Sequence, residues 1–375
     1  MAKQDASAVV DRPGNGRRMI DTDVHECAPR LESLLPYLPT VWHKYLTDYG
    51  WIPDRFLPYS QPTAGGLSRA DALPDGGDPA GSSLALVREQ LLDAYGVEQA
   101  ILTGWLNASG MQEGWVEFKN ALMSAYNDFE VAEWLEPEDR LYGSIHVNSW
   151  DAEAAVREID RMAEHPRMVQ VMLYVGEEAF GAPRYHPIFA AAERHGLTVG
   201  IHHSENSPVA LGRGRYFVEW HTLVPQVFMS QAASLIFNGV FDKYPALKVM
   251  LIEGGFSYVP HLMWHADQQY RQLRHEVPWV KRAPSRIIRE QVRFATQPIE
   301  EFTSPQLLTL IDQMGSDELV CLSTDYPHWD FDSPIESLPV NFPAELARKI
   351  DFENALKTYP RLETAVPREP VGARS

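Results

Sequence analysis

The feature that most constrains the fold is a regular alternation of short apolar runs with longer amphipathic stretches along nearly the whole chain. Short β-branched runs predict buried strands, and apolar residues at helical spacing predict helices. Eight strands are predicted in this way, at residues 18–25, 97–103, 141–147, 168–175, 197–202, 248–253, 292–296 and 319–325. Because a helix follows each strand, the strands should be parallel, and eight such repeats predict a (β/α)8 TIM barrel of the α/β class.

The helical segments complete this pattern. They are predicted at residues 83–95, 115–134, 151–164, 186–195, 225–241, 258–275 and 305–314, with the closing helices inside 334–357. A doubly wound open sheet is the structural alternative. The sequence argues against it, because no GxGxxG follows the first predicted strand and no phosphate-binding loop motif occurs.

Two regions fall outside the alternation. Residues 1–17 have no hydrophobic periodicity and are predicted to be a flexible N-terminal arm, with residues 18–375 forming a single barrel domain. Residues 27–83, after the first predicted strand, contain eight prolines and seven aromatic residues. A long proline-rich segment with so many rings predicts an insertion that packs as a cap over a pocket.

Composition limits the classes of partner and compartment. The formal net charge of −18 argues against nucleic acid and anionic membranes, which attract basic surfaces. No apolar run approaches the ~18 residues of a membrane span, and the N-terminus lacks the apolar segment of a signal peptide. The only cysteines, Cys27 and Cys321, are too few for a disulfide framework. We therefore expect a cytoplasmic protein that acts on small molecules.

Residues with metal-binding side chains gather at the predicted strand ends. In a barrel of this type the site lies at the C-terminal ends of the strands. Four of the eight predicted strands end in such residues, namely Asp23 with His25, His202, Glu253 and Asp325. Asp23 and His25 are two apart, so their side chains project from the same face of a strand. Carboxylates and imidazoles converging at one point suit a divalent metal.

Each of these residues also has a structural interpretation. His202 and His203 point in opposite directions on a strand, so only one faces inward; His202 is preferred, with His203 in the wall. Glu253 could cap the following helix, and Asp325 could form a turn before Tyr326.

Three further histidines lie near the ends of predicted strands or in the segments that follow them. His221 falls between the fifth strand and its predicted helix, where a simple loop histidine is equally compatible. His328 lies in an aromatic loop after Asp325 and could only pack there. His146, near the end of the third strand, is more consistent with a buried structural role.

Several of these stretches together resemble a known family. The segments at residues 21–26, 199–202, 237–255, 296–300 and 323–330 are similar to the amidohydrolase-related family, in the branch of the aminocarboxymuconate-semialdehyde and resorcylate decarboxylases. The resemblance extends from Met19 to about Tyr359. It implies a TIM barrel with a divalent metal, and it places the family's metal positions on Asp23, His25, His202 and Asp325.

The sequence departs from that family at two positions. The first motif is Asp23-Val24-His25, where the family usually has His-x-His or Glu-x-His. Glu253 stands where the decarboxylases carry a histidine base, and a carboxylate cannot replace an imidazole near neutral pH without a large pKa shift. This second departure weakens the decarboxylase interpretation.

The same departure favours a different branch of the family. The chain resembles the two-metal monooxygenases such as isobutylamine N-hydroxylase, which implies two metals, iron and/or manganese, held by Asp23, His25, His202, His221, Glu253, Asp325 and His328. Glu253 and His328 would be the catalytic residues. The resemblance further implies O2, an external electron donor, a small substrate such as an alkylamine, and a homo- or hetero-oligomer with a homologous subunit.

Two other functions remain open. A mononuclear-metal hydrolase or non-oxidative decarboxylase would use a single zinc ion, with Glu253 or His328 as the base. A barrel without activity could instead serve as a structural partner in a hetero-oligomer, although the complete ligand set argues against it.

Overall fold

The computed structural model describes residues 17–48, 66–104, 116–176, 178–204, 207, 209, 212 and 214–363 of the 375-residue chain. Its centre is an eight-stranded sheet in the order β1-β2-β3-β4-β5-β6-β7-β8, in which each strand pairs in parallel with the next. The strands are β1 (Ile20–Val24), β2 (Gln99–Leu102), β3 (Leu141–His146), β4 (Met168–Tyr174), β5 (Thr198–His202), β6 (Val249–Ile252), β7 (Val292–Ala295) and β8 (Val320–Cys321).

The first and last strands close the sheet into a barrel. The Thr22 amide donates to the Leu322 carbonyl over 3.0 Å, and the His25 amide donates to the Tyr326 carbonyl over 2.7 Å. The Asp325 amide donates in turn to the Asp23 carbonyl over 3.1 Å. The predicted (β/α)8 TIM barrel is therefore confirmed.

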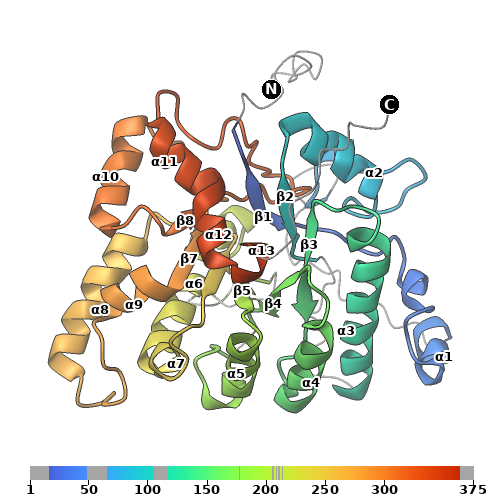
Figure 1. Ribbon diagram of the computed structural model, residues 1–375, viewed down its shortest axis with the longest axis horizontal. Helices are drawn as coiled ribbons and strands as arrows, with labels where there is room; N and C mark the ends of the chain where they lie inside the picture. The colour runs from blue at the N-terminus through green and yellow to red at the C-terminus, as the bar shows by residue number, and fades with distance from the viewer. Residues whose placement is uncertain are drawn as a thin grey trace.

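Helices surround the strands on the outside of the barrel (Figure 1). The α-helices are α1 (His43–Thr47), α2 (Leu84–Val87), α3 (Val116–Glu130), α4 (Ala152–Met162), α5 (His186–Arg194), α6 (Phe217–Phe237), α7 (Val240–Lys243), α8 (Val259–Leu273), α9 (Pro284–Gln291), α10 (Ser304–Met314), α11 (Ala344–Arg348), α12 (Asn354–Thr358) and α13 (Pro360–Glu363). The 3₁₀ turns are η2 (Leu31–Leu34), η3 (Thr40–Trp42), η4 (Ala70–Ala72) and η8 (Pro183–Tyr185), and the π-helical turns are η5 (Arg88–Asp93), η7 (Val131–Leu135) and η9 (Lys349–Glu353).

The alternation of side chains along the strands separates two core layers. On β5 and β6, Val199, Ile201 and Leu251 belong to the outer layer, which packs against the helices. Met250 and Ile252 belong to a second, inner layer that also contains residues of η9, α12 and α13. Residues that alternate with the outer layer thus face the barrel interior.

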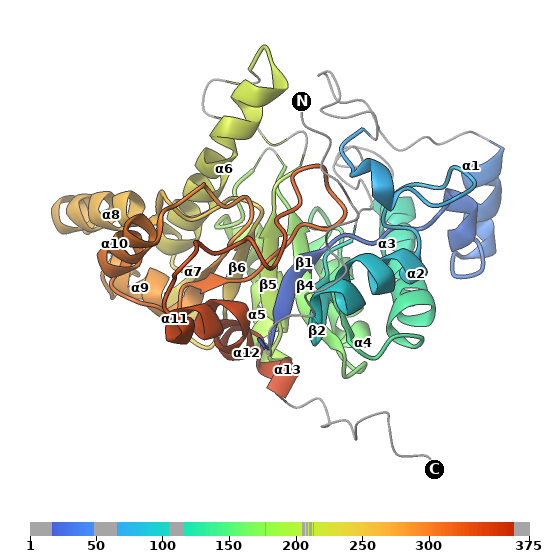
Figure 2. The ribbon, with the colours of Figure 1, turned by 90° about the horizontal axis from the view of Figure 1, so that it is seen from above.

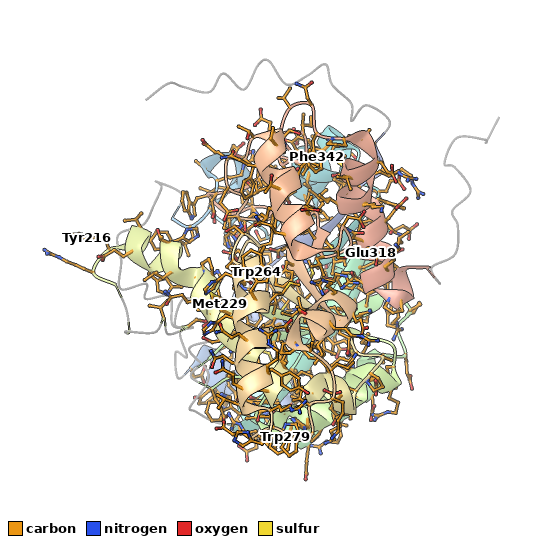
Figure 3. All side chains as sticks on the ribbon, turned by 90° about the vertical axis from the view of Figure 1, so that its left-hand side faces the viewer. Tyr216, Met229, Trp264, Trp279, Glu318 and Phe342 are labelled. Carbon is orange, nitrogen blue, oxygen red and sulfur yellow. The ribbon has the colours of Figure 1, made fainter. Side chains whose placement is uncertain are left out.

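Helix α6 differs most from the prediction. It begins at Phe217 rather than at residue 225, and Pro225 lies inside it. Buried Trp220, Val224 and Phe228 lie on both sides of the proline, and their packing stabilises a helix that the proline alone would interrupt. In Figure 2 the N-terminal part of α6 extends away from the barrel, and Figure 3 shows Tyr216 at its outer end.

Part of the predicted cap insertion lies beside the loop that follows β8. The amide of Arg69 donates to the Pro327 carbonyl and the amide of Trp329 donates to the Leu67 carbonyl, each over 2.9 Å. Residues 49–65 of the insertion and residues 1–16 of the predicted arm lie outside the described residues. Among the helices that are described, none has the length and apolarity needed to cross a membrane.

Candidate metal centre

The strand register determines which side chains reach the mouth of the barrel. Val24 lies in the outer core layer, so its neighbours Asp23 and His25 face the interior. Ile201 also lies in the outer layer, so His202 faces the interior. This agrees with the preference for His202 over His203.

Two acidic residues leave their strands in an uncommon backbone conformation. Glu253 directly follows β6 with φ at 61°, and Asp325 lies beyond β8 with φ at 59°. Non-glycine residues rarely adopt this left-handed region, and those that do cluster at functional sites. The strained turns thus place two carboxylates at the C-terminal mouth of the barrel.

Six buried side chains meet at this mouth. His25 Nε2 lies 3.0 Å from Asp325 Oδ1, 3.3 Å from Asp23 Oδ1 and 4.0 Å from Glu253 Oε2. His202 Nε2 lies 2.6 Å from Glu253 Oε2. His328 completes the set: its Nδ1 contacts Asp325 Oδ1, and its ring centroid is 4.4 Å from that of His25.

These residues form two overlapping groups of ligand atoms. One contains Asp23, His25, His202 and Glu253, the other His25, Glu253, Asp325 and His328, and within each group the atoms lie within 4.8 Å of one another. His25 and Glu253 are shared. Six of the seven residues predicted as ligands are therefore brought together.

The free atoms of the cluster fit a cation. Asp23 Oδ2 is buried and has no hydrogen-bond partner among the described residues, and the buried His202 Nε2 and Glu253 Oε2, 2.6 Å apart, have none there besides each other. The Nδ1 atoms of His25 and His202 donate to the carbonyls of Gly104 and His203, over 2.8 and 2.5 Å. Because carbonyls only accept, Nδ1 of each ring carries a proton, which leaves Nε2 as the atom that can bind a metal.

Charge balance within the cluster also favours a cation. Burial would raise the pKa of Glu253, but the adjacent His203 and His202 hold it well below its usual range. Burial and the charge of Glu253 raise the pKa of Asp325 well above its usual range. Burial lowers the pKa of His328 to about 4, so this imidazole is neutral at pH 7. A divalent cation would compensate the crowded carboxylates.

Three neighbouring side chains orient the cluster. Thr103 Oγ1 donates to Asp23 Oδ1 over 2.7 Å, Gln297 Nε2 donates to Asp325 Oδ2 over 3.2 Å, and His203 Nε2 lies 2.9 Å from Glu253 Oε1. Sequence reasoning did not assign roles to Thr103 and Gln297. The available signal was their position, since both are polar residues at the ends of predicted strands.

His221 is the predicted ligand that stands apart. It lies on α6 rather than in a loop, and its Nε2 is 3.4 Å from Asp330 Oδ2. Its ring stacks on Phe217, with Trp329 on another side. It belongs to neither of these two groups, nor to any other group of metal-binding side chains found among the described residues. The prediction that His221 completes a second metal position is therefore not met by this geometry.

The sequence matches a known family profile and curated proteins. The family profile described as "Amidohydrolase" matches residues 20–361. A gamma-resorcylate decarboxylase from Polaromonas sp. is 25% identical over 293 residues, which cover 72% of this chain and 86% of that protein.

Solved structures of similar fold cover nearly the same range. An amidohydrolase from Mycobacterium avium subsp. paratuberculosis superposes with a TM-score of 0.69 at 21% identity, over 92% of this chain and 99% of that one. A dihydroxybenzoic acid decarboxylase from Polaromonas sp. was solved with manganese and 2-nitroresorcinol. It superposes with a TM-score of 0.63 at 18% identity, over 92% of this chain and 97% of that one.

Proposed function

Because the chain belongs to the amidohydrolase family, we propose that it is a metal-dependent enzyme that releases CO2 from a hydroxylated aromatic acid without an oxidant. The observation that carries this proposal is the buried group of carboxylates and imidazoles at the mouth of the barrel. The curated relatives support it, since they are gamma-resorcylate decarboxylases. This is the alternative that the sequence ranked below the monooxygenase.

A single divalent cation, such as the manganese of the Polaromonas structure, would be held by Asp23, His25, His202 and Asp325. Their side chains are buried, and Asp23 Oδ2 has no hydrogen-bond partner among the described residues. When bound, the cation would act as a Lewis acid towards oxygen atoms of the substrate.

Glu253 is the residue to which we assign proton transfer. Decarboxylation breaks a carbon–carbon bond, and the carbon that loses CO2 must take up a proton. Glu253 Oε1 is held by His203, whereas Oε2 faces the cluster. The free carboxylate is ionised at neutral pH. A bound anionic substrate would raise its pKa and so favour its protonation at the step that needs it.

His328 has a different role in this proposal. Its neutral imidazole contacts Asp325 Oδ1 through Nδ1, so it orients a ligand rather than carrying a proton. The sequence left Glu253 and His328 as equal candidates for the base. The geometry favours Glu253.

The test is an anaerobic assay with manganese and a panel of aromatic acids that includes 2,6-dihydroxybenzoate and 5-carboxyvanillate. We expect CO2 and the matching phenol.

The variants test the role of Glu253. Glu253→Gln should lower kcat roughly 10²–10⁴-fold, the usual contribution of a positioned proton-transfer group, and Glu253→Asp should retain more activity. An absence of CO2 across the panel, or full activity of Glu253→Gln, would refute the proposal. A hydrolase would instead act on esters or amides in the same preparation.

One observation favours a second candidate, the two-metal monooxygenase. The two groups of ligand atoms share His25 and Glu253, and a shared carboxylate can bridge two metals. None of the relatives reported above is named an oxygenase, so this candidate rests on geometry alone. It requires two redox metals at the mouth, O2 and an external electron donor. Turnover that stops without O2 would establish it over decarboxylation.

A further inference from the structure

A second group of ionisable side chains lies behind the first, between the barrel and α3. It consists of Glu26 after β1, Glu130 at the end of α3 and His146 at the end of β3. One ligand atom from each lies within 4.8 Å of the others, and all three residues are buried. The amidohydrolase centre described above uses none of them.

Two atoms in this group are aimed at each other without bonding. Glu130 Oε2 and His146 Nε2 are 3.8 Å apart, which is too far for a hydrogen bond, and neither has a partner among the described residues. Leaving two such atoms unsatisfied in a buried site costs several kcal/mol in general. Something outside the chain should therefore satisfy them.

The other polar atoms of the group are fixed by the protein. Glu130 Oε1 accepts from the Ser144 amide over 3.0 Å, and Glu26 Oε2 accepts from the Gly104 amide over 2.9 Å. The Tyr126 hydroxyl lies 3.1 Å from Glu26 Oε1. These contacts hold both carboxylates in place while leaving one Glu130 oxygen directed at the gap.

The donor set and its spacing match a metal ion. Two carboxylates neutralise a divalent cation, and oxygen and imidazole ligands about 2.0–2.2 Å from one ion lie roughly 3–4 Å from each other. Burial lowers the pKa of His146 to about 3, so its ring is neutral, the form that binds metals. Burial and the charge of Glu26 raise the pKa of Glu130 well above its usual range, a cost that a cation removes.

We propose that Glu26, Glu130 and His146 form a second site, structural in role, for a divalent cation such as Zn²⁺ or Mn²⁺. The site is closed to substrate. The Tyr126 ring packs edge-on against His146, and a Cβ at position 104 would lie only 2.4 Å from His146 Cε1. The cation would join β1, β3 and α3.

The two centres are connected through one residue. The Gly104 carbonyl accepts from His25 Nδ1, and its amide donates to Glu26. The second site would thereby stabilise the backbone that orients His25. It does not depend on the proposed decarboxylation, since it makes no contact with substrate.

The test counts metal in the full chain with the first centre disabled by His202→Ala and Asp325→Asn. After loading with Zn²⁺ or Mn²⁺ and gel filtration, elemental analysis should find about one equivalent, with a raised melting temperature, as for other structural metals. Adding Glu130→Gln or His146→Gln should remove both the metal and the stabilisation. Adding Glu158→Gln, a matched carboxylate outside the group that bonds Asn127, should change neither.

Two results would overturn the inference: no retained metal in the disabled parent, which would leave only water in the gap, or equal metal content with and without Glu130→Gln. If the disabled parent does not fold, the same comparison is made in the otherwise native chain. There, Glu130→Gln should lower the metal content by about one equivalent while Glu158→Gln does not.

Discussion

Thr103 shows how much a single hydroxyl group can control at the metal centre. Its Oγ1 donates to Asp23 Oδ1 over 2.7 Å in a fully buried environment. Thr103→Val keeps the shape of the side chain and removes the donor. Since partners of metal ligands typically contribute 10–100-fold to metal affinity, we expect Mn²⁺ to bind roughly 10-fold or more weakly. Calorimetric titration of the metal-free protein measures this.

The matched control is Thr103→Ser, which retains the hydroxyl and should bind Mn²⁺ nearly as tightly as the wild type. Equal affinities for the valine and serine variants would show that Asp23 is oriented by the backbone alone.

The sequence was informative about individual residues where strand alternation decides their direction. It placed Asp23, His25 and His202 on the inner face, because a period of two fixes the face of a strand residue. It could not assign Thr103 to Asp23 or Gln297 to Asp325, because those hydrogen bonds join segments far apart in the chain. Nor could it foresee the left-handed backbone at Glu253 and Asp325.

At the scale of elements, the sequence misplaced the start of one helix and missed another, and both contain a proline. The helix was predicted to begin at residue 225, a proline, which is a common residue in the first turn of helices. In the structure, α6 begins at Phe217, and the Glu219 side chain supports its first turn by accepting from the Tyr216 amide over 2.8 Å. This moves His221 from a loop to a helix and pairs it with Asp330. Helix α9, which begins with Pro284, was not predicted.

Glu138 links the segment before β3 to η5 and should make stability depend on acid pH. It receives hydrogen bonds from Arg88 over 2.8 Å and from Arg140 over 2.9 Å. Burial alone would raise its pKa, but these two arginines lower it to about 2. Because the folded-state pKa is depressed, the stabilisation is present above pH ~4.5 and is lost as the pH falls towards 2.

Glu138→Gln should therefore lower the free energy of unfolding by about 1–2 kcal/mol at pH 7, allowing for solvent screening of the partly exposed arginines. The difference from wild type should shrink as the pH is lowered from 4.5 to 2.5, as measured by urea unfolding. The exposed neighbour Glu136, changed to Gln, serves as the control. A difference that stays constant with pH would contradict the assigned pKa.

Gly254 sets the distance between the end of β6 and α6. A Cβ there would lie 2.2 Å from Phe228 Cδ2, a ring that is fully buried. Gly254→Ala should cost roughly 1–3 kcal/mol, as overpacking of a core does. Phe228→Leu in the same chain should relieve part of this cost, so the double variant should be more stable than the sum of the single effects. Additive effects in thermal unfolding would rule out this contact as the cause.

For the whole molecule, the alternation of strands and helices was sufficient to predict the barrel, because few topologies accept eight parallel strands with right-handed connections. It could not show how the ring closes. β8 is only two residues long. The seam, where β1 meets β8 and the segment after it, is completed by hydrogen bonds beyond β8, such as that from the His25 amide to the Tyr326 carbonyl. The seam lies directly under the metal-binding cluster, with Asp23 and His25 on one side and Asp325 on the other.

A bound cation should therefore stabilise the seam more than any other part of the barrel. A ligand at about 100 times its Kd adds ~2.7 kcal/mol to the free energy of unfolding. Removing the metal with a chelator should lower the melting temperature by roughly 3–4 °C, as this energy implies for a chain of 375 residues. Amide hydrogen exchange should accelerate at residues 22–25 and 322–326. It should change little in the β4–β5 pair, which is paired along the whole of β5. The control is Asp325→Asn, which removes a metal ligand. In this variant the amides of the seam between β1 and the segment after β8 should exchange rapidly with or without the chelator. Uniform acceleration around the barrel, or none, would mean that no cation joins β1 to the segment after β8.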